Sequence, residues 1–179
     1  MTAFGVVQKM LKIESGVIAE YFTICELFRN KFEVVVSPNP NNEDWDCIVI
    51  KSPCGSFLDI KLQVKGVLWQ EKTGMQPTIT GNFSSDIDFD YLVIVVINFD
   101  NESDYLTYIV PKQDLLNGSE TDQKQGLLCE TSKKIRFTNK SIAFSTFSNE
   151  RYKKIMDEKY LNNWGQIENG ITKTCTRTK

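Results

Sequence analysis

The sequence predicts an α/β domain with a mixed central β-sheet flanked by helices. The segment SGVIAEYFTICELFRN (15–30) repeats apolar residues at helical spacing, with Ser15 in a position suited to an N-cap. Short runs rich in valine and isoleucine follow, and NERYKKIMDEKYLNNW (149–164) has a second helical pattern that ends before Gly165. A helix, a series of strands and a final helix in this order are typical of an α/β core.

The first three expected strands include a hairpin. FEVVVS (32–37) is short and rich in β-branched residues, and a loop separates it from DWDCIVIK (44–51). That segment pairs naturally with SFLDIKLQVKG (56–66) through a turn at 53–56. Within 58–65 apolar and polar residues alternate strictly, which is typical of a strand with one buried face.

The later strands are more apolar. YLVIVVINF (91–99) is nearly continuous in apolar residues, which predicts a central strand covered on both faces. YLTYIVP (105–111) predicts another strand, with a long polar loop after it. KKIRFT (133–138) and SIAFSTF (141–147) predict edge structure, whereas 67–90 mixes turn residues with isolated aromatics and is expected to be irregular.

The chain of 179 residues has the size of one domain, which we place at 1–167, with a flexible tail at 168–179. No apolar run reaches the roughly 20 residues that cross a bilayer, and the N-terminus lacks the apolar core of a signal peptide. These features predict a cytoplasmic protein without a membrane partner.

Histidine and cysteine usage excludes several classes of enzyme. The chain contains no histidine, which removes Ser-His-Asp hydrolases, Cys-His proteases and the commonest zinc hydrolases. Its five cysteines are scattered and include no Cys-x-x-Cys pair, so neither a disulfide framework nor a structural zinc site is expected. Hydrolytic chemistry here would depend on carboxylates, amides, lysine and a hard metal ion.

The basic residues are unevenly distributed. The net charge of −2 gives no overall signal for nucleic-acid binding, but lysine and arginine concentrate at 132–140, 150–154 and 173–179. Such runs form either a solvated face or a phosphate-binding one. The candidates for contact with nucleic acid are Lys61, Lys133, Lys134 and Arg136.

The predicted hairpin brings polar residues together on one face. Directly opposed residues of an antiparallel pair share a face, about 5 Å apart. Asp46, Gln63 and Lys65 should therefore cluster at one end of the hairpin, and Asp59 should lie nearer the turn. Counting outward from a two-residue turn, the opposed pairs are Ile50 and Asp59, Ile48 and Lys61, and Asp46 and Gln63.

The first helix carries an acid within its apolar arc. Glu20 falls between Ile24 and Leu27 on a helical projection. An acid on a buried face should be paired, coordinated to a metal or shifted in pKa, although a glutamate at the edge of the arc could also reach solvent. The residues that define the arc are Val17, Tyr21, Ile24, Leu27 and Phe28.

Together these residues resemble the catalytic motif of the PD-(D/E)xK nuclease superfamily, whose fold is the restriction-endonuclease-like core. The matching residues are Glu20 in GVIAEYF, Asp46 in EDWDCIVI, and Gln63 and Lys65 in DIKLQVKG. The resemblance covers about residues 14–111. The sequence departs from the family pattern in that tryptophan replaces the proline before the aspartate, and Gln63 stands where an acid is common.

The resemblance implies a Mg²⁺-dependent DNA endonuclease of the restriction, homing or junction-resolving type, acting on double-stranded DNA as a homodimer or larger oligomer. Asp46, Gln63, the backbone carbonyl of Val64 and Glu20, directly or through water, would hold the metal, for which Mn²⁺ could substitute. Lys65 would favour the hydroxide form of the metal-bound water and help to bind the scissile phosphate.

Three alternatives stay open. Asp59-Ile60-Lys61 is a rival motif in the same strand, and Asp44 is a rival to Asp46, although Asp44 precedes the strand. The fold could also serve as a binding module for nucleic acid or protein without the reaction, because Gln63 removes one negative charge from the site. Finally, the polar face of the hairpin could be only solvated, in which case Glu20 would lie far from Asp46.

Overall fold

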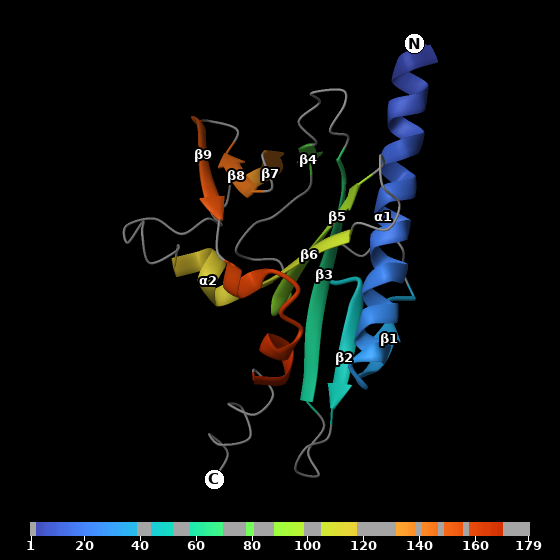
Figure 1. The fold of residues 1–179 in the computed structure, drawn as a ribbon, viewed down its shortest axis with the longest axis vertical. Helices are drawn as coiled ribbons and strands as arrows, with labels where there is room; N and C mark the ends of the chain where they lie inside the picture. The colour runs from blue at the N-terminus through green and yellow to red at the C-terminus, as the bar shows by residue number, and fades with distance from the viewer. Residues whose placement is uncertain are drawn as a thin grey trace.

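The protein is described from a computed structural model, which covers residues 3–38, 44–51, 58–69, 78–80, 88–98, 105–117, 132–138, 141–146, 149–155 and 158–169. None of the helices in these ranges is both long and apolar enough to cross a membrane. The elements in chain order are α1 (Ala3–Arg29), β1 (Glu33–Val36), β2 (Cys47–Lys51), β3 (Leu58–Trp69), β4 (Thr78–Thr80), β5 (Tyr91–Asn98), β6 (Tyr105–Pro111), α2 (Lys112–Asn117), β7 (Ser132–Thr138), β8 (Ser141–Thr146), β9 (Asn149–Ile155) and the 3₁₀ turn η1 (Glu158–Tyr160) (Figure 1).

Five strands form a mixed sheet in the order β1-β2-β3-β5-β6. Strands β3 and β5 are parallel, and the other neighbours are antiparallel. All residues from 91 to 97 in β5 are buried, because β5 is a central strand and both faces of the sheet are covered. The predicted fold class and the predicted central strand are therefore confirmed.

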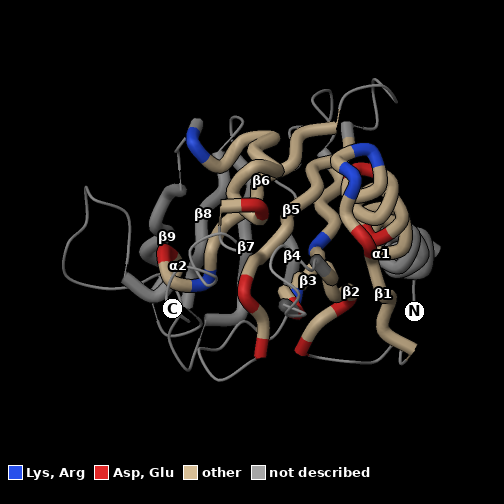
Figure 2. Tube along the Cα trace, turned by 90° about the horizontal axis from the view of Figure 1, so that it is seen from below, with Lys and Arg blue, Asp and Glu red and all other residues tan. Residues whose placement is uncertain are grey.

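The two faces of this sheet are covered by different parts of the chain. Helix α1 packs on one face, and α2 with the remaining strands lies on the other side (Figures 1 and 2). The helix approaches β3 very closely at Gly66, where an added Cβ would lie 2.1 Å from the backbone oxygen of Ser15 and 3.0 Å from the Cβ of Ala19. Only glycine permits this approach, which brings the middle of α1 over β3.

The predicted buried face of α1 is wrong in part. Ser15, Ala19, Thr23 and Leu27 form the buried stripe, whereas three members of the expected arc, Val17, Tyr21 and Phe28, are exposed. The reason is the close approach at Gly66, which favours small side chains on the helix and turns the larger ones outward. The helix also begins at Ala3, so Ser15 lies in its interior and is not an N-cap.

The predicted C-terminal helix is also wrong. Residues Asn149–Ile155 form β9, the last strand of a four-stranded sheet with the order β4-β7-β8-β9. Pairing with β8 supplies the backbone hydrogen bonds that a helix would otherwise provide, and it places Ile155 opposite Ile142. The short helix α2 likewise occupies part of the expected polar loop, while β3 extends to Trp69 and β4 lies within the expected irregular region.

The end of the chain differs from the expected tail in one respect. Residues 165–169 are helical, so the segment predicted to be flexible from residue 168 begins within a helical turn. Its remaining residues, 170–179, and the predicted turn at 53–56 lie outside the described residues.

Candidate active site

The hairpin register matches the prediction. Ile50 lies opposite Asp59 and Ile48 lies opposite Lys61 in the pairing of β2 with β3. The last pair is Cys47 with Leu62, after which β3 continues for seven residues alongside β5 without a β2 partner. From Gln63 onward, one edge of β3 is therefore open, and polar groups at this edge are accessible to side chains from elsewhere.

Asp46 stands at the start of this open edge. Its N–H donates to the carbonyl oxygen of Leu62 at 2.9 Å, and its carbonyl oxygen accepts from the N–H of Ser37 at 2.9 Å. Its carboxylate oxygen Oδ2 accepts from the N–H of Val64 at 2.5 Å. The carboxylate thus takes the place of a strand partner, and the backbone holds it in a fixed orientation.

The carbonyl of Val64 points to the same edge. In an extended strand the N–H and C=O of one residue face the same neighbour, as they do in a hydrogen-bonded antiparallel pair. Because the Val64 N–H meets Asp46, the Val64 carbonyl oxygen is directed to the side of β3 on which Asp46 lies. A backbone oxygen and a carboxylate therefore occupy one edge.

Glu20 reaches this edge from α1. It follows Ala19, which contacts β3 at Gly66, and its side chain is half-buried. Burial raises the pKa of Glu20, and the negative charge of Asp46 raises it further, while the positive charge of Lys65 lowers it. Glu20, Asp46 and Lys65 are therefore within electrostatic reach of one another.

The pKa of Asp46 has the same balance of causes. Burial raises it above its ordinary value, although Lys65 and the hydrogen bond from Val64 act in the opposite direction. Two carboxylates that are each disfavoured as anions stand beside one ammonium group. A divalent cation would remove this electrostatic cost, which makes the pair suited to binding one.

Gln63 supplies an amide oxygen to the same region. Its side chain is only 1% exposed, and it lies next in register after Leu62, on the side of β2 where Asp46 stands. Gln63 makes other interactions, but its Oε1 atom is buried and accepts no hydrogen bond from the described residues. A buried carbonyl oxygen of this kind is unusual, and coordination of a metal ion is one way to satisfy it.

These donors fit a hard metal ion. Among the described residues, no three His, Cys, Asp or Glu side chains lie close enough together to hold a metal. A metal at this edge would depend on Glu20, Asp46 and the carbonyl oxygens of Gln63 and Val64. An all-oxygen set with few protein ligands suits Mg²⁺, which keeps several waters. The nearby Cys47 is no competitor, because burial and the two carboxylates raise the pKa of its thiol to about 12.

The rival motif has a different environment. Lys61 forms an ion pair with Asp88, and its backbone N–H donates to Oδ2 of Asp90 at 2.8 Å. Asp59 and Asp44 are exposed. Sequence reasoning missed the role of the 88–90 segment, because only the parallel pairing of β3 with β5 brings that segment beside Lys61.

The remaining basic candidates lie in another part of the fold. Lys133, Lys134 and Arg136 belong to β7, in the four-stranded sheet. The structure does not bring them to the open edge of β3, which is next to α1. They are considered below with the strands that surround them.

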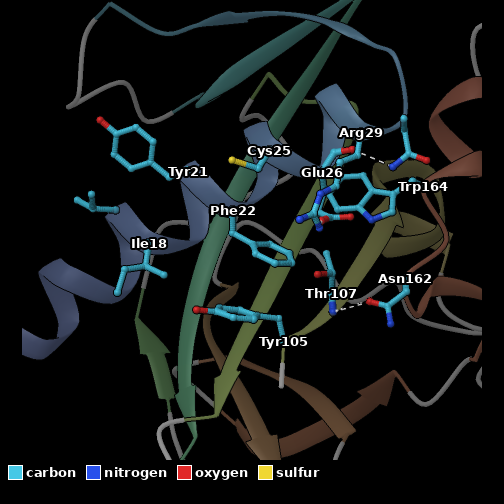
Figure 3. Close-up of a pocket in the computed structure, with 12 residues that line it drawn as sticks. Ile18, Tyr21, Phe22, Cys25, Glu26, Arg29, Tyr105, Thr107, Asn162 and Trp164 are labelled. Atoms are coloured by element: carbon cyan, nitrogen blue, oxygen red, sulfur yellow. Dashed lines mark hydrogen bonds and ion pairs between the residues drawn. The ribbon is translucent and has the colours of Figure 1, made fainter. Parts of the chain in front are cut away.

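A groove that sequence reasoning did not find lies between α1 and β6. It has a volume of about 940 Å³ and contains none of the predicted site residues. Phe22 stacks on Tyr105 at its floor, with ring centroids 4.6 Å apart, and Trp164 closes one end (Figure 3). The groove has few charged groups, so it offers apolar contact and lacks the groups needed for hydrolysis. Its lining residues are Val17, Ile18, Tyr21, Phe22, Cys25, Glu26, Arg29, Asn30, Tyr105, Thr107, Asn162 and Trp164.

Comparison with known proteins gives a structural likeness only. No protein-family model and no curated protein sequence matches the chain. Among solved structures, the chain is similar to the bacterial homing endonuclease I-Ssp6803I, with a TM-score of 0.52 and 16% sequence identity over 90% of this chain and 96% of that one. The protein therefore shares the α/β fold of an endonuclease.

Proposed function

We propose that the protein is a Mg²⁺-dependent endonuclease that hydrolyses phosphodiester bonds in double-stranded DNA, with a site of the PD-(D/E)xK type. The observation that carries this proposal is the anchored carboxylate of Asp46, which accepts the Val64 N–H at the open edge of β3 within electrostatic reach of Glu20 and Lys65. The fold that the chain shares with a homing endonuclease supports it.

Each residue has a distinct role in this proposal. Asp46, Glu20, the side-chain oxygen of Gln63 and the backbone oxygen of Val64 hold the ion. When bound, Mg²⁺ would make a water more acidic and stabilise charge on the phosphate. The hydrogen bond from Val64 fixes the orientation of Asp46 before the ion binds, so little ordering is needed later.

Lys65 acts on the phosphate. Its ammonium group is close enough to Asp46 and Glu20 to lower the pKa of both carboxyls. Next to this anionic pair, the positive charge would attract the scissile phosphate and stabilise the additional negative charge that develops on it. Since histidine is absent from the chain, proton transfer would involve water and these side chains alone.

Two further expectations belong to this proposal. Cutting both strands of a duplex generally requires two sites, so we expect a homodimer or a larger oligomer, which light scattering in solution would test. We also place the protein in the cytoplasm, in association with DNA. Neither expectation alters the roles of the residues at the open edge.

A cleavage assay with supercoiled plasmid tests the proposal. Nicked or linear product should form with Mg²⁺ or Mn²⁺, and EDTA should prevent it. Direct titration of Mg²⁺ into the Asp46→Ala variant should give no binding at this site. Absence of cleavage on varied duplex substrates, or Mg²⁺-dependent cleavage that survives Asp46→Ala, would refute the proposal.

A binding module without hydrolytic activity is the second candidate function. The observation that favours it is Gln63, since an amide contributes one negative charge less than the acid common at this position. It predicts binding of duplex DNA or of a protein that does not change with Mg²⁺. A divalent ion bound between Asp46 and residues 63 and 64 would dismiss it.

A further inference from the structure

The second sheet separates its residues into two chemically different faces. Directly opposed residues of an antiparallel pair share a face, so the printed register assigns each position. Arg136 lies opposite both Thr78 and Ala143, and Lys134 lies opposite both Thr80 and Ser145. The polar face defined in this way contains Thr78, Thr80, Lys134, Arg136, Thr138, Ser141, Ala143, Ser145 and Lys154.

The opposite face is almost entirely apolar. Its one charged residue is Lys153, which lies opposite Phe144 on β9, at the edge of the sheet. A sheet with one apolar and one polar face usually packs the first against the protein and leaves the second in water. The positions on the apolar face are Ile79, Ile135, Phe137, Ile142, Phe144, Lys153 and Ile155.

The polar face has charges of one sign. Lys134, Arg136 and Lys154 are its charged members, and none of the register positions on this face is Asp or Glu. The whole chain, in contrast, has 21 basic and 23 acidic residues. An ordinary solvated face mixes the two signs, so this separation indicates an anionic partner.

We propose that the polar face of the β4-β7-β8-β9 sheet binds double-stranded DNA, with Lys134, Arg136 and Lys154 contacting phosphates. This inference rests on the proposed function, since it takes duplex DNA as the substrate. Lysine, arginine, serine and threonine are common donors to phosphate oxygens. A pair of antiparallel strands also fits the major groove, which is about 12 Å wide.

The register sharpens the earlier set of basic candidates. Lys134 and Arg136 share the polar face, and Lys154, which was not among the candidates, joins them from β9. Lys133 lies at the register shift between Ser132 and Lys134, where the pairing assigns no face. Lys61 is ion-paired with Asp88 in the other sheet and does not belong to this surface.

The neighbouring residues Lys154 and Lys153 provide a matched test. They have the same side chain and lie on the same strand, but on opposite faces. Affinity for a labelled duplex of random sequence is measured against salt concentration in EDTA, so that cleavage does not contribute. Lys154→Ala should reduce the slope of log K against log salt by about one, the value for one lost phosphate contact, whereas Lys153→Ala should change it much less.

The double variant Lys134→Ala/Arg136→Ala should reduce the same slope by about two. If it folds poorly, Ser145→Lys gives the complementary test, because a lysine added to the polar face should raise the slope by about one and tighten binding. Circular dichroism and thermal melting show which variants keep the wild-type fold.

Three results would overturn the inference: equal losses from Lys153→Ala and Lys154→Ala, no effect of the added lysine, or no binding of duplex DNA by the wild-type protein. A protein partner for this face is covered by the last of these. Plasmid cleavage tests the proposed function independently. Cleavage that persists when both Lys154→Ala and Ser145→Lys leave the salt slope unchanged would separate a failure of this inference from a failure of the nuclease proposal.

Discussion

Strand β3 contains the same three-residue pattern twice, in two different environments. Asp59-Ile60-Lys61 lies where β3 has β2 on one side, and Lys61 is ion-paired with Asp88. Gln63-Val64-Lys65 begins where β2 has ended, and the freed edge is occupied by the carboxylate of Asp46. Similar residues thus have different surroundings only two positions apart.

The difference shows that the length of the neighbouring strand selects the site. In the paired part of β3, backbone groups on the β2 side are used in the ladder, and no carboxylate can replace the partner strand. Beyond Leu62 they are available to Asp46, and α1 approaches at Gly66 with Glu20. A motif that could be found twice in the sequence therefore has one position suited to holding an ion.

The largest expected effect is on the two aspartates. Asp46→Asn should lower the rate of Mg²⁺-dependent plasmid cleavage about 10³-fold, since loss of a metal ligand removes several kcal/mol of transition-state stabilisation. Asp59→Asn changes an exposed carboxylate in the paired part of β3 and should lower the rate less than about threefold. Rates from plasmid cleavage measure both, and a larger loss for Asp59→Asn would reverse the choice between the two motifs.

The two lysines should differ in the same direction. Lys65→Ala should lower the cleavage rate about 10²-fold, through loss of charge stabilisation on the phosphate. Lys61→Ala breaks a solvent-exposed ion pair with Asp88, which should cost no more than about 1 kcal/mol of stability and leave cleavage nearly unchanged. Single-turnover kinetics separate a slower reaction from weaker binding. Similar kinetic losses at both positions would contradict the assignment.

Two glycines test the approach of α1 to the open edge. In Gly66→Ala the new Cβ would meet the Ser15 oxygen at 2.1 Å, which should reduce the free energy of unfolding by about 1–3 kcal/mol and displace Glu20. Gly16→Ala is the control, because its Cβ would have no atom within 4 Å and alanine favours a helix by about 0.5–1 kcal/mol. Denaturant titration should therefore show opposite changes, and a neutral Gly66→Ala would argue against the close contact.

The smallest expected effect is a dependence of stability on pH in the absence of metal. The folded-state pKa of Glu20 is raised above its ordinary value near 4.5, so the protonated side chain favours the fold. This contribution is complete below the unfolded pKa and is lost as the pH rises through the folded pKa. Glu20→Gln should reduce the loss of stability with rising pH, as measured by urea titration in EDTA. An unchanged pH profile would show that Glu20 is more solvated than its position indicates.

The sequence was sufficient for the order of most central elements and for the register of the hairpin. Strict alternation in 58–65 and the apolar run at 91–99 correspond to a strand with two kinds of neighbours and to a strand buried on both faces. Alternation with a period of two also fixes which residues share a face once the turn is known. The residues proposed for the site could therefore be chosen before the structure was known.

Residues 149–155 show where local pattern was insufficient. NERYKKI is compatible with either a helix or a strand, and β8 decided for a strand by offering an unpaired edge. The orientation of α1 was also settled by tertiary contact, because the approach to Gly66 selected small residues over Val17 and Tyr21. Neither neighbour is close in sequence, so no local window contains the information.

The sequence by itself determined which side chains are present along β3, their alternation between faces and the absence of imidazole chemistry. Only the tertiary structure decided that β2 ends at Cys47, that Asp46 accepts the Val64 N–H, and that Glu20 comes within electrostatic reach of both Asp46 and Lys65. The physical reason is that local periodicity assigns a residue to a face, whereas an open edge exists only where a neighbouring strand stops and another element approaches.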